Sequence, residues 1–263
     1  MEITTIVGII VGVISVVGAM IFKHISFEVF INPAAFFVIF VGTVATILNS
    51  FPGENIKNIG SLFRILFTKY KGVSEVEIIK LMVELSSLTR REGLLALESR
   101  MEDIDDPFIK KGLRLVVDGM GEDTITDIMG AEISAMEARH EENASIFSSA
   151  GMYAPTLGVL GAVFGLIAAM SHINDTDAMA EAIGAAFIAT ILGIFTGYVL
   201  WNPFAKKLKV KSHEEALIKG MAIEGIIAIQ KGESPVIIKE KLLSVLSYRK
   251  QQEILEELGS GNE

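Results

Sequence analysis

The sequence predicts an all-α membrane protein with four transmembrane helices and a helical cytoplasmic domain. Of its 263 residues, 51% are hydrophobic, and the mean hydropathy of +0.49 is higher than that of ordinary water-soluble domains. Four stretches supply the roughly 20 apolar residues that a helix needs to cross a bilayer. Because a spanning backbone must satisfy its own hydrogen bonds, these stretches are predicted to be helical. They are residues 3–22, 29–51, 146–171 and 182–204.

The basic residues predict the orientation of these spans. The first stretch lacks the positive leading region of a signal peptide and its apolar run is long, so we expect a retained span. Lys23 is the only Lys or Arg in the connections 23–28 and 172–181, and the other 22 of the 23 lie in residues 52–145 or beyond residue 204. By the positive-inside rule, those two basic regions are cytoplasmic and both connections face outward. We expect the second connection, "HINDTDAMAE", to be a solvated turn, and Tyr198 and Trp201 to anchor the fourth span at the interface.

This layout divides the chain into four segments. Residues 1–51 hold the first two spans, 52–145 a cytoplasmic helical domain, 146–204 the last two spans, and 205–263 cytoplasmic helices. Patterns at helix ends support the helical reading of both cytoplasmic segments. They are the capping boxes Ser74…Glu77 and Ser212…Glu215, the cap Asp106-Pro107, and the stop and restart at Gly232 and Ser234-Pro235.

Motifs for catalysis or metal binding are missing from the sequence, and we expect neither an enzyme nor a cofactor or metal site. The chain has no cysteine, and its four histidines are scattered without the spacing of metal ligands. A net charge of −9 argues against nucleic acid as a partner. The glycines of the third span follow no strand and precede no Lys-Ser/Thr, which excludes a phosphate loop.

The span cores contain no titratable side chain. An Asp, Glu, Lys, Arg or His inside a membrane would by default mark an ion pathway, whereas here the polar groups are hydroxyls and amides such as those of Thr190 and Asn49. Either the chain moves no ion, or a second polypeptide supplies the titrating group.

Small residues form stripes on the third and fourth spans. Their spacing of three and four places them on one helix face, which permits close helix packing in lipid. Two interpretations stay open: the two spans pack on each other, or the stripes receive a helix from another chain. Pro155 predicts a kink, and Pro203 is expected to end or bend the fourth span. The glycines of the stripes are Gly158, Gly161, Gly165, Gly193 and Gly197.

Four pieces of the sequence carry a resemblance to a known family. They are "APTLGVLGAVFGL" in the third span, "AFIATILGIFTGYVLWNPFAKKLK" in the fourth, "RREGLLALE" in the loop and "IQKGESP" in the tail. Together with the two-plus-two arrangement of spans, they make nearly the whole chain resemble the A subunit of the bacterial flagellar stator, the MotA family.

The resemblance implies a motility function in the bacterial cytoplasmic membrane. In this family a ring of A subunits, thought to be five, surrounds two copies of a single-span B subunit (MotB type) that carries the membrane aspartate. Ion flow drives rotation, and the loop pushes on the rotor switch protein FliG. The resemblance further implies that Arg90 (or Arg91) and Glu98 contact the rotor, and that Pro155 and Pro203 couple conformational change to ion flow.

The resemblance also bears on the coupling ion. Sodium-type relatives carry threonines where this chain has Ala162 and Ala189, and Thr190 is the remaining hydroxyl near the expected aspartate of the B subunit. Sodium needs several oxygen ligands, whereas a proton needs one titratable group and a hydrogen-bonded path. We therefore expect a proton channel. The alternatives are a proton-driven energiser of outer-membrane transport of the ExbB/TolQ group, which typically has three spans, and a membrane scaffold that conducts no ion.

Overall fold

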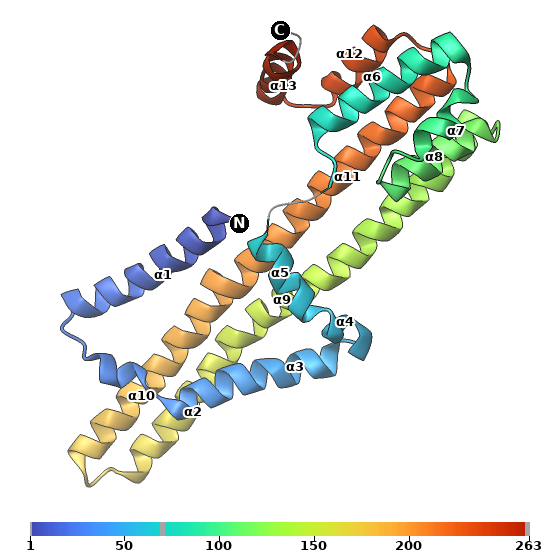
Figure 1. Ribbon diagram of the computed structural model, residues 1–263. Coiled ribbons are helices and arrows are strands. Elements are labelled where there is room, and N and C mark those ends of the chain that lie inside the picture. The colour runs from blue at the N-terminus through green and yellow to red at the C-terminus, as the bar shows by residue number, and fades with distance from the viewer. Residues whose placement is uncertain (1, 69–71, 261–263) are drawn as a thin grey trace. The chain divides into compact units, whose positions relative to one another are not determined.

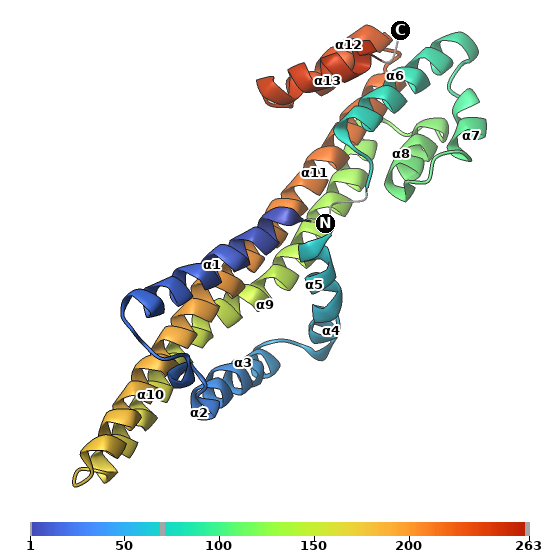
Figure 2. The same cartoon turned by 60° about the vertical axis from the view of Figure 1, so that its left-hand side comes forward.

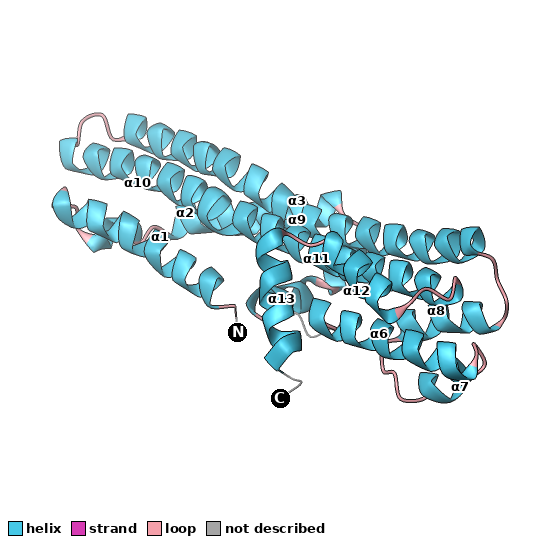
Figure 3. Ribbon diagram, turned by 90° about the horizontal axis from the view of Figure 1, so that it is seen from above, coloured by secondary structure: helices cyan, strands magenta, loops and turns pink. Residues whose placement is uncertain are grey.

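The chain folds into two compact units, which are described separately (Figure 1). The computed structural model describes residues 2–68 and 72–260. Unit 1 comprises Met1–Tyr70 with Arg139–Lys211, and unit 2 comprises Lys71–Ala138 with Ser212–Glu263. Regular structure in the described residues is entirely helical, as predicted (Figure 3). The predicted segment boundaries at residues 145 and 204 both fall inside continuous helices.

Unit 1 holds the apolar helices. The prediction of four spans is confirmed, because four helical stretches are long and apolar enough to cross a membrane. The third lies within α9 (Glu122–Ser171), which begins well before the apolar stretch. The first span is α1 (Ile3–Phe22), the second is formed by α2 (Pro33–Phe36), the π-helix η2 (Phe37–Val41) and α3 (Gly42–Ser50), and the fourth by α10 (Thr176–Phe195), the π-helix η3 (Thr196–Trp201) and the start of α11 (Asn202–Gln230). The short elements of this unit are the 3-10 helix η1 (Phe27–Phe30), α4 (Gly53–Lys57) and α5 (Ile59–Phe67).

The connection between the third and fourth spans is shorter than predicted. Helix α10 begins at Thr176, because the Asp175 carboxylate caps it by accepting a hydrogen bond from the Ala178 N–H at 3.1 Å. The predicted solvated turn over residues 172–181 was therefore wrong in its second half. Both views show the end of α9 and the start of α10 joined by this tight turn and running side by side (Figures 1 and 2).

Trp201 is half-buried and packs against other aromatic side chains of unit 1. Its ring lies 6.1–6.4 Å from the rings of Phe63, Phe147 and Phe204, and the four form one aromatic cluster. Helix α5 supplies one of these partners, Phe63, which hydropathy could not reveal, and the interfacial position of Trp201 stays a prediction. Tyr198 is exposed, as an anchor would be.

Unit 2 is a bundle around a core of large apolar side chains. The predicted capping box of Ser74 and Glu77 opens α6, Asp106 caps α8, and Ser234 caps α12 after the predicted stop at Gly232. Helix α12 lies beside α6 (Figure 1). The helices wholly in this unit are α6 (Glu75–Glu92), α7 (Ala96–Met101), α8 (Pro107–Val117), α12 (Pro235–Ser244) and α13 (Tyr248–Ser260), and the outer parts of α9 and α11 complete it.

The predicted capping box at Ser212 was wrong. Helix α11 continues through this residue without interruption. The Glu215 carboxylate lies 3.9 Å from the Lys219 ammonium one turn later, which is an ordinary pair within a helix. A Ser-x-x-Glu pattern marks a helix start only where the preceding residues leave the helix, and no Gly or Pro breaks the chain here.

Candidate functional site

The glycines of the two small-residue stripes form the contact between α9 and α10. A Cβ atom on Gly158 would lie 2.8 Å from the Ala189 carbonyl oxygen, and one on Gly193 would lie 2.7 Å from the Ala154 carbonyl oxygen. A Cβ on Gly165 would lie 2.8 Å from the Cβ of Ala186. Real Cβ atoms do not approach so closely, so the two backbones can meet only because side chains are absent. The structure thus follows the first interpretation, spans packing on each other, and the contact with a partner helix stays a prediction.

The predicted ion-pathway residues lie along this contact. Ala189 is buried, and a Cβ on Gly161 would lie 3.0 Å from its methyl carbon. Thr190 follows it on α10, half-buried, and its hydroxyl donates to the Ala186 carbonyl at 3.3 Å. The threonine proton is therefore used within the helix, while its oxygen can still accept a hydrogen bond. Ala162 is half-buried on α9 and adds no polar atom.

Acidic and basic side chains occur only near the ends of these spans. Asp177 and Glu181 lie in the first two turns of α10, and both are exposed. Among the described residues, no group of three or more His, Asp or Glu could hold a metal ion. The spans therefore offer helix backbone and hydroxyls, and a proton carrier in this region would have to come from another molecule.

The π-helix η3 connects the two predicted coupling prolines. A Cβ on Gly197 would lie 2.7 Å from the Cγ of Pro155, so the π segment rests directly on the proline of α9. Pro203 follows the segment by two residues and has no N–H, which leaves a carbonyl of η3 without its α-helical partner. The helix does not end at Pro203, because α11 continues to Gln230, and a bend of the fourth span at this proline stays a prediction. Single-turn π segments recur at functional sites, and the sequence carried no signal for this one.

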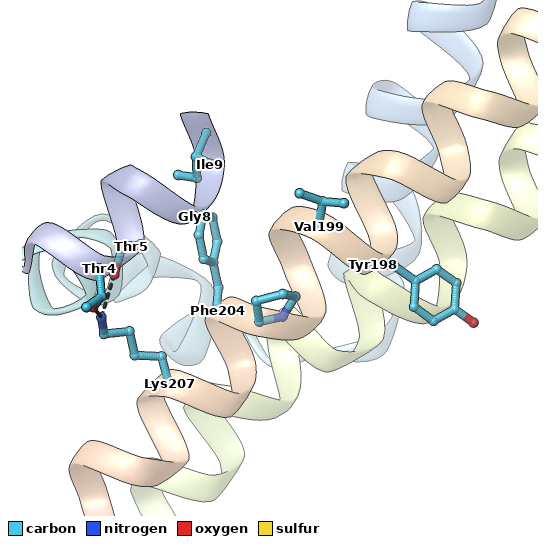
Figure 4. A pocket seen from close by; sticks show the side chains of 9 residues that line it. Thr4, Thr5, Gly8, Ile9, Tyr198, Val199, Phe204 and Lys207 are labelled. Atoms are coloured by element: carbon cyan, nitrogen blue, oxygen red, sulfur yellow. Dashed lines mark hydrogen bonds between the residues drawn. The ribbon is translucent and has the colours of Figure 1, made fainter. Parts of the chain in front are cut away.

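A polar network that the sequence analysis missed joins the start of α1 to α11. The Glu2 carboxylate lies 2.9 Å from the Lys207 ammonium and 3.4 Å from that of Lys211. Lys207 also donates to the hydroxyls of Thr4 and Thr5 at 3.0 and 2.6 Å (Figure 4). The hydrogen bond from Lys207, aided by Lys211, outweighs burial and lowers the pKa of Glu2 below its ordinary value.

The same region contains a cavity and a helix cap. Lys211 donates to the carbonyl oxygens of Ile65 and Thr68 at 2.7 and 2.5 Å and so caps the end of α5. A cavity of about 420 Å³ lies between α1 and the η3–α11 segment, with Phe204 projecting toward Gly8 (Figure 4). The spacing of four between Lys207 and Lys211, which places both on one helix face, was the one available signal for this network.

The predicted rotor-contact residues lie at the junction of α6 and α7 in unit 2. Arg90 and Arg91 are in the last turn of α6, and Glu98 is in the first turn of α7. Gly93 ends α6 with a φ of +85°, a conformation that favours glycine. All three charged side chains are exposed, and within the described residues none of them forms an ion pair. Exposure therefore does not decide whether Arg90 or Arg91 is the predicted rotor-contact arginine.

Comparison with known proteins agrees with this architecture. Residues 100–221 match the MotA/TolQ/ExbB proton channel family. Motility protein A of Bacillus subtilis is 48% identical over 98% of this chain and 95% of its own length, and that of Borreliella burgdorferi is 32% identical over 98% and 99%. The flagellar MotAB stator complex of B. subtilis contains a similar chain, with a TM-score of 0.89 and 48% identity over 94% of this chain and 97% of that one.

The fold and the span contact define an all-helical, four-span membrane protein of the proton channel class, with no titratable group in its span cores. Within that class, the near full-length matches are more specific. The chain belongs to the motility protein A (MotA) family of flagellar stator subunits.

Proposed function

We propose that this chain is the A subunit of a flagellar stator that works with a single-span B subunit of the MotB type. The supporting observation is the missing proton carrier: the packed spans α9 and α10 hold hydroxyls but no titratable core residue. The similar structures are of MotAB complexes, from B. subtilis and from C. jejuni. In our proposal the B subunit's aspartate carries the ion past Thr190, Ala162 and Ala189.

The coupling ion in this proposal is the proton. Ala162 and Ala189 contribute no side-chain oxygen, so Thr190 supplies the single side-chain oxygen among these three positions. This leaves too few oxygen atoms for the several ligands that a dehydrated sodium ion requires. A proton, in contrast, can ride on one carboxylate and leave along a hydrogen-bonded path.

Torque in this proposal passes from the spans to a rotor partner. Pro155 and Pro203, which flank η3, allow the span backbone to change shape, and Arg90 and Glu98 contact the rotor switch protein FliG. The large loop and the C-terminal region face the cytoplasm, and the subunits form a ring of five around two B subunits. Exposed ion pairs contribute only about 0.2–1 kcal/mol each, which suits a contact that must form and release repeatedly.

Deleting the gene tests the function. We expect cells that still assemble flagella but do not swim, and complementation should restore swimming equally well when external sodium is replaced by potassium at constant pH. Co-purification of a single-span protein with one Asp near the start of its span would identify the B subunit. Normal swimming after deletion, with impaired nutrient uptake, would instead identify an ExbB/TolQ-type energiser, which the family match over residues 100–221 keeps as the second candidate. A sodium requirement would contradict the proton.

A further inference from the structure

The turn between α6 and α7 exposes a large apolar side chain in the middle of charged residues. Leu95 is 71% exposed, and its neighbour Leu94 is 37% exposed. Two residues further along, Leu97 is fully buried in the core of unit 2. We call residues 93–97 the leucine turn. An exposed leucine is not unusual by itself. Whether Leu95 marks a contact surface therefore depends on how the turn is held and on which residues surround it.

Backbone hydrogen bonds and the buried Leu97 hold the leucine turn in place. The Gly93 N–H donates to the Thr89 carbonyl at 2.8 Å, and the Glu98 N–H donates to the Leu95 carbonyl at 3.1 Å. The positive φ of Gly93 reverses the chain between α6 and α7, which lie next to each other in unit 2 (Figure 1). Leu95 is therefore presented by a defined backbone, which lowers the entropy that a partner must remove on binding.

Unused charges of both signs border the leucine turn. Arg90 and Arg91 precede it, and Glu92 and Glu98 flank it, and none of the four forms an ion pair or a side-chain hydrogen bond with a described residue. The next arginine behaves differently. Arg100 binds Glu84 at 2.8 Å and Asp103 at 2.6 Å, so it fastens α7 to α6. Arg100 is thus used within the fold, whereas the charges around Leu95 are available to another molecule.

We infer that Leu95 is the apolar anchor of the rotor contact. This inference rests on the proposed stator function and adds the chemistry of the partner surface. That surface holds an apolar pocket for the leucine, an acidic side chain facing the arginines of α6, and a basic side chain facing Glu98. The charges select and orient the partner, and the leucine slows its release, because apolar burial holds a contact more strongly than exposed ion pairs do.

The charges around the leucine turn favour a protein surface over an anionic lipid surface as the partner. An anionic lipid surface would attract Arg90 and Arg91 but would repel Glu92 and Glu98 at the same turn. A protein surface with both signs of charge satisfies all four. A second copy of this chain could offer such a surface too, and the experiment below separates it from the rotor by measuring stator assembly independently.

The test compares Leu95→Ser with two matched variants in cells that lack the chromosomal gene. Leu95→Met keeps an apolar side chain at the turn, and Val236→Ser removes an equally exposed apolar side chain (70%) from α12. Purification yield of the stator complex reports assembly, and the dwell time of fluorescent stators at the motor reports the rotor contact. For Leu95→Ser we expect an unchanged yield and a roughly ten-fold shorter dwell time, the loss that burial of one leucine predicts. Leu95→Met and Val236→Ser should match the parent.

Arg90→Glu in the same strain distinguishes a failure of the Leu95 anchor from a failure of the proposed stator function. If it shortens the dwell time while Leu95→Ser does not, the leucine anchor is wrong and the stator function stands. If Leu95→Ser lowers the yield of the complex, the turn contacts another copy of the chain, which also overturns the anchor. If deletion of the whole gene leaves swimming intact, the proposed function itself fails.

Discussion

Unit 1 and unit 2 are both helical, yet different side chains hold their helices together. In unit 1, α9 and α10 meet through glycine and alanine, and large side chains such as Leu48 and Phe187 point outward and are exposed. In unit 2, the large apolar side chains are inside. Those with no measurable exposure include Ile78, Met82, Leu85, Leu113, Met129, Ile226, Ile238 and Leu242.

This difference follows from the solvent around each unit. Water drives large apolar side chains together, so a water-exposed bundle gains stability by burying leucine and isoleucine. Lipid is as apolar as leucine and gives no such drive, so helices in a membrane associate through close backbone approach. Substitution of a contact glycine is thus expected to destabilise unit 1, and substitution of a buried leucine is expected to destabilise unit 2.

The largest expected effect is in the core of unit 2. Leu242→Ala should lower the free energy of unfolding by about 2–5 kcal/mol, because it removes apolar contacts and leaves a cavity. Leu48→Ala, at an exposed position of α3, should change it by well under about 1 kcal/mol, since lipid or detergent replaces the lost contacts. Thermal unfolding of the purified protein in detergent, followed by circular dichroism, measures both. Equal losses would contradict the comparison.

The next effect is at the glycine contact of unit 1. Alanine favours a helix over glycine by about 1 kcal/mol, so Gly184→Ala, with nothing within 4 Å of the added Cβ, should be neutral or stabilising. Gly193→Ala is in the same helix but forces its Cβ against the Ala154 carbonyl, and should destabilise by about 1–3 kcal/mol. Opposite signs in the same unfolding measurement support the contact. A stabilised Gly193→Ala would show that α9 and α10 are not in backbone contact.

The smallest effect concerns ion pairs. Glu2→Gln should cost about 0.5–1.5 kcal/mol at neutral pH, because the Glu2 carboxylate contacts two lysines and is only 24% exposed. Since the folded state lowers the pKa of Glu2, this stabilisation is fully present above the ordinary pKa of glutamate and is lost as the pH falls from there through the lowered pKa of the folded state.

Glu253→Gln is the control for that variant, because Glu253 pairs with Arg249 at 2.9 Å on the exposed surface of α13. It should cost well under about 1 kcal/mol. Unfolding midpoints of the two variants, compared with the parent at neutral and acidic pH, separate the partly buried Glu2 network from the exposed pair of α13. If both variants melt like the parent at neutral pH, the Glu2 network does not stabilise the fold.

Local sequence patterns predicted many helices and caps in both units, but only where residues close together in the sequence determine the local structure. Span one was predicted at the residues that α1 occupies, and the caps at Ser74, Asp106 and Ser234 are present because the cap and the N–H that it accepts are two or three residues apart. The same kind of pattern failed at Ser212, where α11 continues through it. The roles given to Arg90 and Glu98 came from resemblance, since their exposed positions alone would suit any solvated helix.

The sequence by itself determined that the chain is helical, that four stretches suit a membrane, and that their cores lack a proton carrier. These are properties of composition and of short spacing, because a backbone in lipid must form its own hydrogen bonds. Only the tertiary structure decided which faces meet. It placed η3 on Pro155, Glu2 between Lys207 and Lys211, and Leu95 outside the core. The first two join residues far apart along the chain, and the third depends on how α6, α7 and α12 pack, so neighbouring residues cannot determine them.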